Sequence, residues 1–341
     1  MIFSARAPVR ISLCNGGDTD YYIKEMGWGN LINATLATHN YWCIAEPKKQ
    51  NFIKYTYINK FHKKFLNCII NPDQKKIDEN MKLIVTTIKE INPEFRGDMQ
   101  IITNVPEKSG LGGSSSLVVS LIKTLAKTKG YSHSTPEEIA RLAYKIEREI
   151  LGIKGGYQDQ WAATFGGGVN YLEFRKNKNI FIEPLWLHEK TMKYLEDNLL
   201  LFHLEPRKGN SSEAHNILEK KLKKNKKESL SIMIDRRNNV MLTREVLLSN
   251  NLKKLAELLN DEQRKKELLN PKTITENSKV IYEEAINSGA LGGKVSGTGK
   301  GGCAFFICKK QHQLKIIKNL KMLDAIHIQF KLQRLSNMGE F

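Results

Sequence analysis

Pro106-Glu-Lys-Ser-Gly-Leu-Gly-Gly-Ser-Ser-Ser116 lies between two segments with different hydrophobic periods. Met99-Gln-Ile-Ile-Thr103, before it, has the composition of a strand, and the apolar residues of 117–127, after it, recur at helical spacing. Glycines let backbone N–H groups turn inward, and the amino end of a helix adds roughly half a positive charge. The run therefore indicates an anion cradle whose serine hydroxyls could meet phosphate or Mg²⁺. It is not a Walker A loop, because no Gly-Lys-[Ser/Thr] closes it, and an ordinary flexible turn with a serine N-cap is the alternative.

A second glycine-rich run, Gly297-Thr-Gly-Lys-Gly-Gly302, formally matches G-x-G-x-x-G. A dinucleotide fingerprint must open a helix after the first strand of a βαβ unit. Here the glycines lead into the strand-like Cys303–Ile307 near the carboxyl end, so the context excludes a dinucleotide site. A turn that touches a ligand, or one that only joins a helix to a strand, remains.

Two carboxylates are candidates for chemistry. Asp159 lies between two glutamines in a glycine-bracketed segment, where it could act as a general base. An Asx turn or a helix cap is the alternative for Asp159. Glu147 lies on a helix that should start at Thr135, where a capping box is expected with Glu138, and end near Gly152. On its own, Glu147 is typical of a solvated helix face.

Short patterns predict an α/β chain throughout. Strands are expected over 6–13, 31–36, 41–45, 52–61, 99–103, 169–174, 199–204 and 303–307, with a turn over 15–20. Helices are expected over 81–91, 117–127, 135–152, 215–269 with a break near 249–251, and 274–287. The 341 residues allow about two domains of roughly 100–200 residues. The composition shifts near residue 186, so we expect domains over residues 1–187 and 188–341.

Composition excludes several classes of protein. Hydrophobic residues make up 40% and charged residues 26%, which is ordinary globular usage. No apolar run approaches the ~18 residues of a membrane span, and no signal-peptide pattern follows Met1. We therefore expect a cytoplasmic protein whose five cysteines are reduced and mostly buried. The eight histidines have no zinc spacing, and His203 and His215 are interpreted as ordinary surface or supporting residues.

Lys and Arg number 54 against 36 Asp and Glu, which gives a net charge of +18. Such a field attracts polyanions, so nucleic-acid binding is one hypothesis. The basic residues are dispersed, however, and the densest run, 220–227, has almost no aromatic interleaving. A solvated helix face explains that run, and a site for doubly phosphorylated small molecules would also benefit from the charge.

Taken in order, three segments resemble the GHMP sugar-kinase superfamily. They are Ala7–Leu13 with Gly16–Tyr21, Pro106–Ser116, and Lys294–Cys303. Leu31-Ile-Asn-Ala-Thr35 and Gly155-Gly-Tyr-Gln-Asp-Gln160 make the closest likeness that of the bacterial D-glycero-D-manno-heptose 7-phosphate kinases. The galactokinase-type Gly-Glu-His-Thr-Asp-Tyr is replaced by Gly16-Gly-Asp-Thr-Asp-Tyr21, which argues against galactose. Asp18 also stands where the heptose-kinase version has a third glycine.

The resemblance implies an amino-terminal domain like the second domain of ribosomal protein S5 and a ferredoxin-like carboxyl-terminal domain. It implies an ATP- and Mg²⁺-dependent phosphotransferase that converts the heptose 7-phosphate to the 1,7-bisphosphate, for nucleotide-activated heptose supply to surface polysaccharide. ATP and a sugar phosphate are then the ligands, without nucleic acid or membrane, and the oligomeric state stays open. An L-fucokinase-like sugar 1-kinase is the alternative within the superfamily, and a basic nucleic-acid-binding protein is the alternative outside it.

The resemblance also implies roles for individual residues. Asp159 would be the catalytic base, Arg10 would lie near the transferring phosphoryl group, and Glu147 with Ser114 would hold Mg²⁺. The residues implied to bind the ATP phosphates are Lys108, Ser109, Gly110, Leu111, Gly112, Gly113, Ser114, Ser115 and Ser116. Those implied to bind the sugar phosphate are Asp18, Thr19, Asp20, Gly156, Arg207, Gly297, Thr298 and Gly299. Arg207 is expected to meet the sugar's distal phosphate.

Overall fold

The computed structural model describes residues 1–16, 18–74, 77–130, 135–177, 179–206 and 211–334. Seven strands form the first sheet: β1 (Phe3–Cys14), β2 (Trp28–Pro47), β3 (Ile53–Asn59), β4 (Lys64–Ile70), β5 (Gly97–Thr103), β6 (Val169–Arg175) and β7 (Ile180–Pro184). Their order is β4-β3-β5-β2-β6-β7, with β1 paired to β2. Only the β3–β5 pair of this sheet is parallel.

The two strands expected over 31–36 and 41–45 are one continuous strand of 20 residues, β2. The polar stretch 38–40 between them stays extended, with Thr38 exposed to solvent. Along one side, residues 32–36 and 40–45 of β2 pair with nearly the whole of β1. Along its other side it pairs with β6 at one end and with β5 at the other. This long strand therefore carries the middle of the sheet and holds β1, the strand of Arg10, in place.

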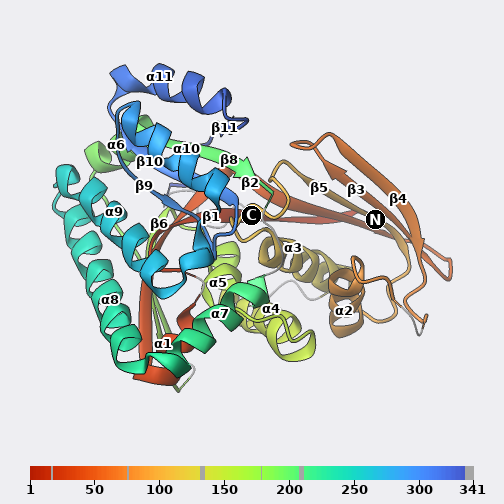
Figure 1. Cartoon of the computed structure of the whole chain (residues 1–341). Coiled ribbons are helices and arrows are strands. Elements are labelled where there is room, and N and C mark those ends of the chain that lie inside the picture. Colours follow the sequence, from red (N-terminus) through yellow and green to blue (C-terminus); the bar gives the residue numbers. More distant parts are fainter. Residues whose placement is uncertain (17, 75–76, 131–134, 178, 207–210, 335–341) are drawn as a thin grey trace.

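Helices cover one face of the first sheet (Figure 1). They are α2 (Lys82–Ile91), α3 (Gly113–Thr128), α4 (Pro136–Tyr144), a π-helix (Lys145–Ile150) and α5 (Gln158–Phe165), while α1 (Thr19–Met26) joins β1 to β2. The capping box predicted at Thr135 is present, because Thr135 Oγ1 accepts from Glu138 N at 3.2 Å and Thr135 N donates to Glu138 Oε2 at 2.8 Å. Apolar side chains of α3, such as Leu121 and Leu125, pack with Ile11 of β1 in one buried cluster.

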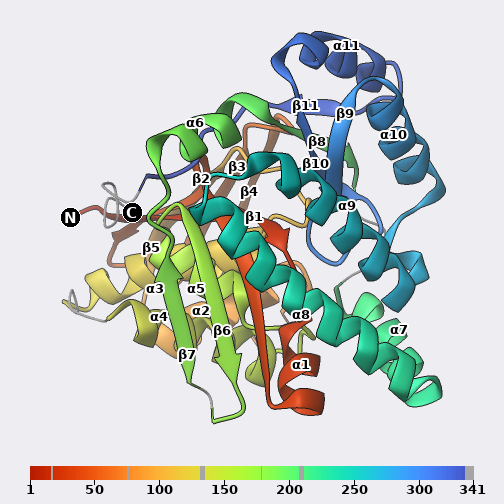
Figure 2. The same ribbon diagram turned by 90° about the vertical axis from the view of Figure 1, so that its left-hand side faces the viewer.

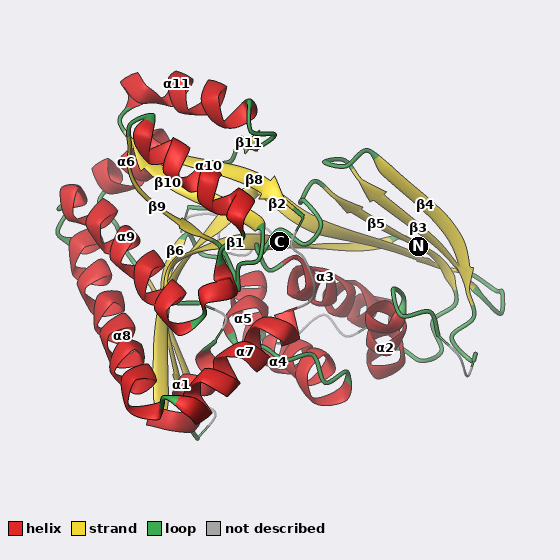
Figure 3. Ribbon diagram, viewed as in Figure 1, coloured by secondary structure: helices red, strands yellow, loops and turns green. Residues whose placement is uncertain are grey.

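The second sheet contains β8 (Leu199–Glu205), β9 (Ala290–Val295), β10 (Gly302–Cys308) and β11 (Ile326–Ile328). Its order is β11-β8-β10-β9, antiparallel at every pair. Counted from its first strand, this is the 4-1-3-2 order of a ferredoxin-like sheet, as expected. Figure 3 shows helices on its outer side. The helices of this half are α6 (Glu189–Asn198), α7 (Ser211–Lys224), α8 (Lys226–Leu248), α9 (Leu252–Leu269), a 3₁₀ turn (Pro271–Thr273), α10 (Glu276–Asn287) and α11 (Lys310–Lys321).

The helical stretch expected over 215–269 consists of three helices. The predicted break near 249–251 separates α8 from α9, and a further break at Asn225, which no glycine or proline marks, separates α7 from α8. Figure 2 shows α8 and α9 lying side by side. Among the described residues, none of these helices is both long and apolar enough to cross a bilayer.

The two sheets share one core. The expected boundary between residues 187 and 188 falls between β7 and α6, yet Phe305 of β10 belongs to the same buried cluster as Ile11 of β1. After β11 the chain returns to the first sheet, where Leu332 forms a bridge with Leu36 and Gln333 N donates to Thr35 O at 2.9 Å. The carboxyl-terminal residues therefore help to complete the amino-terminal half. All five cysteines are unpaired thiols, and four are buried.

Candidate active site

The glycine-rich run forms the amino end of α3. The helix begins at Gly113, earlier than the predicted 117, so the three serines lie in its first turn. Its N-cap is Gly112, in the left-handed conformation with φ +82° and without a side-chain cap, so no serine caps it. The first N–H groups of α3 are therefore left for a ligand, and a helix amino end favours an anion.

The second glycine-rich turn packs against this loop. An added Cβ at Gly110, where φ is +73°, would lie 2.8 Å from Ser296 O, and one at Gly297 would lie 2.8 Å from Gly110 O. Only residues without a side chain let the two backbones approach this closely. The turn continues into β10, as its context predicted.

Asp159 lies in the first turn of α5 and not in a loop, because the polar segment after Tyr157 is already helical. Arg10 of β1 donates to Asp159 Oδ1 from Nε at 3.0 Å and from Nη2 at 2.5 Å. Its third nitrogen, Nη1, donates to Gly110 O at 2.7 Å. Arg10 is buried, and the Asp159 side chain is 24% exposed. Arg10 thus ties an accessible carboxylate to the glycine loop.

Glu147 is buried, not solvated, because the helix changes to a π-helix at Lys145 and turns this side chain inward. Its carboxylate accepts from Ser114 Oγ at 2.7 Å, Ser115 Oγ at 2.6 Å and Gln160 Nε2 at 2.5 Å. All three donors are neutral, and among the described residues no Lys or Arg reaches Glu147 within 4.0 Å. A buried carboxylate beside a serine hydroxyl is a hard-oxygen set that fits Mg²⁺.

The described residues hold no group of three His, Cys, Asp or Glu side chains that could enclose a metal ion. Mg²⁺ usually keeps several waters and is shared between one or two carboxylates and substrate phosphates. The Ser114–Glu147 pair therefore fits an ion that arrives with a nucleotide better than a permanently enclosed one.

These groups line one cavity of about 240 Å³. The expected site residues that line it are Arg10, Lys108, Ser109, Gly110, Gly112, Gly113, Ser114, Ser115, Glu147, Gly156, Asp159, Gly297 and Thr298. Residues separated by nearly 290 positions in the sequence are thus brought to one site.

Other expected site residues lie elsewhere. The Leu111 side chain is buried in the core, and the Ser116 hydroxyl donates to Pro8 O at 2.7 Å. Gly299 faces the backbone of Thr273, and Thr19 Oγ1 accepts from Tyr157 N at 3.0 Å. None of these four lines the cavity. Arg207 lies outside the described residues.

Asp18 belongs to a buried ion network that the sequence did not indicate. Arg236 of α8 donates from Nη1 to Asp18 Oδ2 at 2.7 Å and from Nη2 to Glu262 Oε1 at 2.9 Å. Lys294 Nζ lies 3.6 Å from the same Glu262 oxygen. Burial alone would raise the pKa of Asp18, but the Arg236 guanidinium holds it below its ordinary value. Arg236 and Glu262 lie in Lys- and Leu-rich helices, where nothing in the pattern separates them from surface charges.

A second, smaller cavity of about 40 Å³ adjoins the first, and His215, Gly297 and Thr298 line both. His215 is only 2% exposed, which excludes a surface residue and leaves the other interpretation, a supporting residue. Its ring stacks on Tyr21 with a centroid distance of 5.7 Å, beside the first turn of α1. Asp20, expected to bind sugar hydroxyls, lies next to it with Oδ1 3.9 Å from His215 Nδ1.

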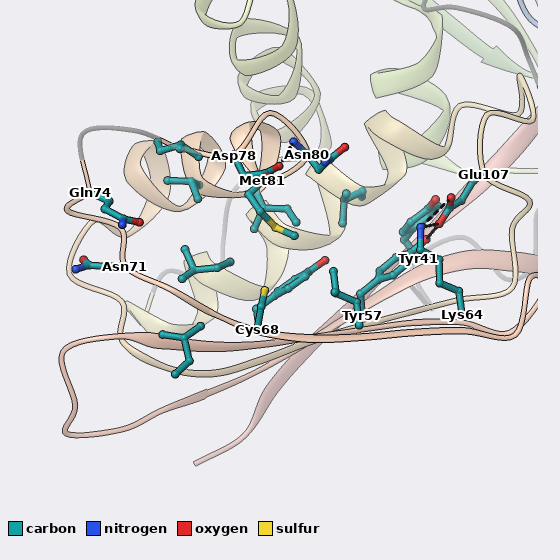
Figure 4. Close-up of a pocket in the computed structure, with 18 residues that line it drawn as sticks. Tyr41, Tyr57, Lys64, Cys68, Asn71, Gln74, Asp78, Asn80, Met81 and Glu107 are labelled. Carbon is teal, nitrogen blue, oxygen red and sulfur yellow. Dashed lines mark hydrogen bonds and ion pairs between the residues drawn. The ribbon is translucent and has the colours of Figure 1, made fainter.

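A third cavity, of about 670 Å³, opens between α2 and the strands β3 and β4 (Figure 4). Tyr41 lines it and also the first cavity. At this end Glu107 Oε1 accepts from Tyr57 OH and from Lys64 Nζ, both at 3.1 Å. Farther from the loop the lining mixes apolar residues, Met81 among them, with the polar Asn71, Gln74, Asp78 and Asn80.

Comparison with known proteins shows which families and solved structures this chain is similar to. The GHMP kinases N terminal domain matches residues 81–167, and GHMP kinases C terminal matches residues 243–321. The chain is 32% identical over 324 residues to the D-glycero-alpha-D-manno-heptose 7-phosphate kinase of Campylobacter jejuni, covering 93% of this chain and 92% of the relative. It is 29% identical to the mevalonate kinase of Methanothermobacter thermautotrophicus, over 62% of this chain and 64% of that one. A solved structure described as a D-glycero-D-manno-heptose 1-phosphate kinase from Bacteroides thetaiotaomicron superposes with a TM-score of 0.75 at 25% identity, covering 97% of this chain and 96% of the other.

Proposed function

The chain belongs to the GHMP kinase family, and from this premise we propose that it transfers the γ-phosphoryl group of ATP to the C1 hydroxyl of D-glycero-D-manno-heptose 7-phosphate. One observation carries the reaction type: the amino end of α3, the Ser114–Glu147 pair and the Arg10–Asp159 pair face a single cavity. The acceptor is supported by the relative that is 32% identical over nearly the whole chain. The 1,7-bisphosphate would supply nucleotide-activated heptose for surface polysaccharide, from the cytoplasm.

Phosphoryl transfer needs positioning and neutralisation of charge more than covalent chemistry. The uncapped N–H groups at the start of α3 would hold the ATP phosphates, with Lys108 at the cavity wall. Ser114 and Glu147 would hold Mg²⁺, which offsets the negative charge of the phosphates when it is bound. The third cavity would take the nucleotide base, since it shares Tyr41 with the first cavity and lies beside the glycine-rich loop.

Asp159 would accept the proton of the acceptor's C1 hydroxyl as that oxygen attacks the γ-phosphorus. Both hydrogen bonds from Arg10 fall on Oδ1, so Oδ2 is the oxygen left for the acceptor. Arg10 fixes the position of Asp159 relative to Gly110, because it donates to both. The guanidinium also lies where it can stabilise charge that develops on the transferring group.

Phosphorus NMR of the protein with Mg-ATP and D-glycero-D-manno-heptose 7-phosphate tests this function. We expect a new anomeric phosphate signal that grows together with ADP. Consumption of ATP without that signal would show hydrolysis or a different regiochemistry. Turnover only with an unphosphorylated sugar such as L-fucose would favour the L-fucokinase-like alternative.

Asp159→Asn tests the proposed base in the same assay. We expect turnover to fall by about 10²- to 10⁴-fold while ATP still binds, because the amide cannot accept the proton but keeps the side-chain shape. Asp235→Asn, on an exposed position of α8, is the control and should leave the rate unchanged. A rate near that of the unmodified protein for Asp159→Asn would refute the assignment.

A further inference from the structure

We propose that the second cavity holds the acceptor's own phosphate group, and that His215 and Lys266 bind it. This inference rests on the proposed function, because it concerns the far end of the same sugar phosphate. It concerns residues that the structure describes, whereas Arg207, the expected phosphate contact, lies outside them.

The position of the cavity suits an elongated acceptor. This cavity and the one that contains Asp159 are adjacent, because both are lined by His215, Gly297 and Thr298. In a heptose 7-phosphate the phosphate lies at the opposite end of the sugar from the C1 hydroxyl. An acceptor with C1 at Asp159 would extend past His215 and place its phosphate in the second cavity.

His215 is a buried side chain without a hydrogen-bond partner. It is 2% exposed, and neither ring nitrogen has a partner in the described structure. The nearest carboxylate oxygen, Asp20 Oδ1, lies 3.9 Å from Nδ1, which is too far for a hydrogen bond. Stacking on Tyr21, whose hydroxyl donates to His215 O at 2.9 Å, fixes the ring in this position. Buried polar groups are normally satisfied, so an orphaned imidazole on a cavity wall indicates a missing ligand atom.

The charges around the cavity indicate that this ligand is an anion. Three buried basic side chains, Arg236, Lys266 and Lys294, face the buried carboxylate of Glu262 and the partly exposed one of Asp18. Arg236 neutralises Asp18, the carboxylate that lines the cavity, by direct ion pairing. Lys266 donates to a backbone carbonyl at 2.9 Å, and among the described residues no carboxylate lies within 4.0 Å of its ammonium. Burial, with Lys294 and Arg236 nearby, lowers the pKa of Lys266 well below its ordinary value, and a bound phosphate beside the amine would restore its charge.

Kinetics with two acceptors tests the assignment. Heptose 7-phosphate is compared with unphosphorylated D-glycero-D-manno-heptose in the unmodified protein, in His215→Asn and in Lys266→Met. We expect each substitution to raise KM for the 7-phosphate by about 10- to 100-fold, as for the loss of a hydrogen bond to a charged group, with kcat and the KM for ATP little changed. The KM for the unphosphorylated sugar should stay the same.

Lys265→Met is the matched control. Lys265 is the neighbouring residue of α9, pairs with Asp261 at 2.6 Å and lines neither cavity, so its loss should change neither acceptor's KM. If Lys266→Met fails to fold, Lys266→Arg, which keeps the charge, and His215→Asn carry the test. Arg207→Met is assayed in parallel.

The outcomes separate the two proposals. Suppose that the unmodified protein phosphorylates the 7-phosphate, but His215→Asn and Lys266→Met leave its KM unchanged or raise the KM of both acceptors equally. The proposed phosphate site is then wrong, and the proposed function stands. If only Arg207→Met raises the KM for the 7-phosphate relative to that for the unphosphorylated sugar, the phosphate does not bind in the second cavity. If the unmodified protein does not phosphorylate the 7-phosphate at all, both the proposed function and the proposed phosphate site are wrong.

Discussion

Single residues in the site carry charge that the protein alone does not balance. Glu147 is held by three neutral donors, although a buried carboxylate is normally paired with a cation. Its burial follows from the local π-helix, and its neighbours are Ser114 and Ser115 in the first turn of α3. The side chain is therefore better suited to a bound cation than to stabilising the fold.

Glu147→Gln tests this at the residue scale. We expect turnover to fall by about 10-fold or more, as for loss of a group that orients a metal. The melting temperature without Mg-ATP should stay the same or rise, because an unpaired buried charge is removed, while the increase caused by Mg-ATP should shrink. Thermal melting with and without Mg-ATP measures both effects. Glu149→Gln, exposed on the same π-helix, is the control, and a large loss of stability for Glu147→Gln alone would show a structural role.

Part of the site could be predicted from sequence and part could not. Ser114, Glu147 and Asp159 occur in ordered motifs, so resemblance indicated them before the structure brought them together. His215 and Arg236 occur on polar helices where burial leaves no trace in the local pattern. Their roles come from packing against α1, which only the folded chain shows.

At the scale of elements, the site depends on how closely two glycine-rich segments meet. The loop before α3 and the turn before β10 touch through Gly110 and Gly297, and Cys303 N donates to Ser109 O at 2.8 Å. Helix starts and strand periods could be predicted because they are local properties of the sequence. This contact could not, because it joins two elements from different sheets.

Gly110→Ala is the corresponding prediction. The new methyl would strain a left-handed backbone, at about 1–2 kcal/mol, and would also lie 2.8 Å from Ser296 O. We expect a lower melting temperature and a raised KM for ATP. Gly130→Ala is the control for backbone strain alone, since Gly130 has φ +79° and nothing lies within 4 Å of the added Cβ. Equal losses in the two variants, with unchanged KM for ATP, would show that the contact between loop and turn does not matter.

At the scale of the whole molecule, a buried ion network joins the two halves. Arg236 contacts Asp18 across 218 positions of sequence, and Lys294 of β9 donates to Asn15 O at 2.8 Å. The two-sheet architecture could be predicted, since each sheet forms from neighbouring patterns and from the resemblance. The network and the shared core could not, because they pair residues whose local sequences are unrelated.

Arg236→Met should destabilise the protein by about 3–5 kcal/mol, because it leaves Asp18 and Glu262 buried without their main cation. Urea unfolding measures the loss. Arg264→Met removes a surface pair with Asp261 at the same distance of 2.7 Å and should cost less than about 1 kcal/mol. Similar losses in both variants would contradict a special role for the network.

The same network predicts acid sensitivity. The pKa of Asp18 is lower in the folded protein than its ordinary 3.8, so the folded state releases the proton more readily than the unfolded chain. Its ionised form therefore contributes stability at neutral pH, and that contribution falls as the pH drops below about 4. The difference in unfolding free energy between the unmodified protein and Asp18→Asn should shrink over that range. A difference that stays constant with pH would rule out this linkage.

The return of the chain to the first sheet also affects when the protein can become active during synthesis. Gln333 Oε1 accepts from Gly167 N at 3.1 Å, just beyond the end of α5, the helix that carries Asp159, and Gln333 N donates to Thr35 O of β2. A ribosome synthesises β2 and α5 well before Gln333. Until Gln333 is made, Gly167 N and Thr35 O in the nascent amino-terminal half lack these hydrogen bonds. Catalytic competence should thus appear only after Gln333 has been synthesised.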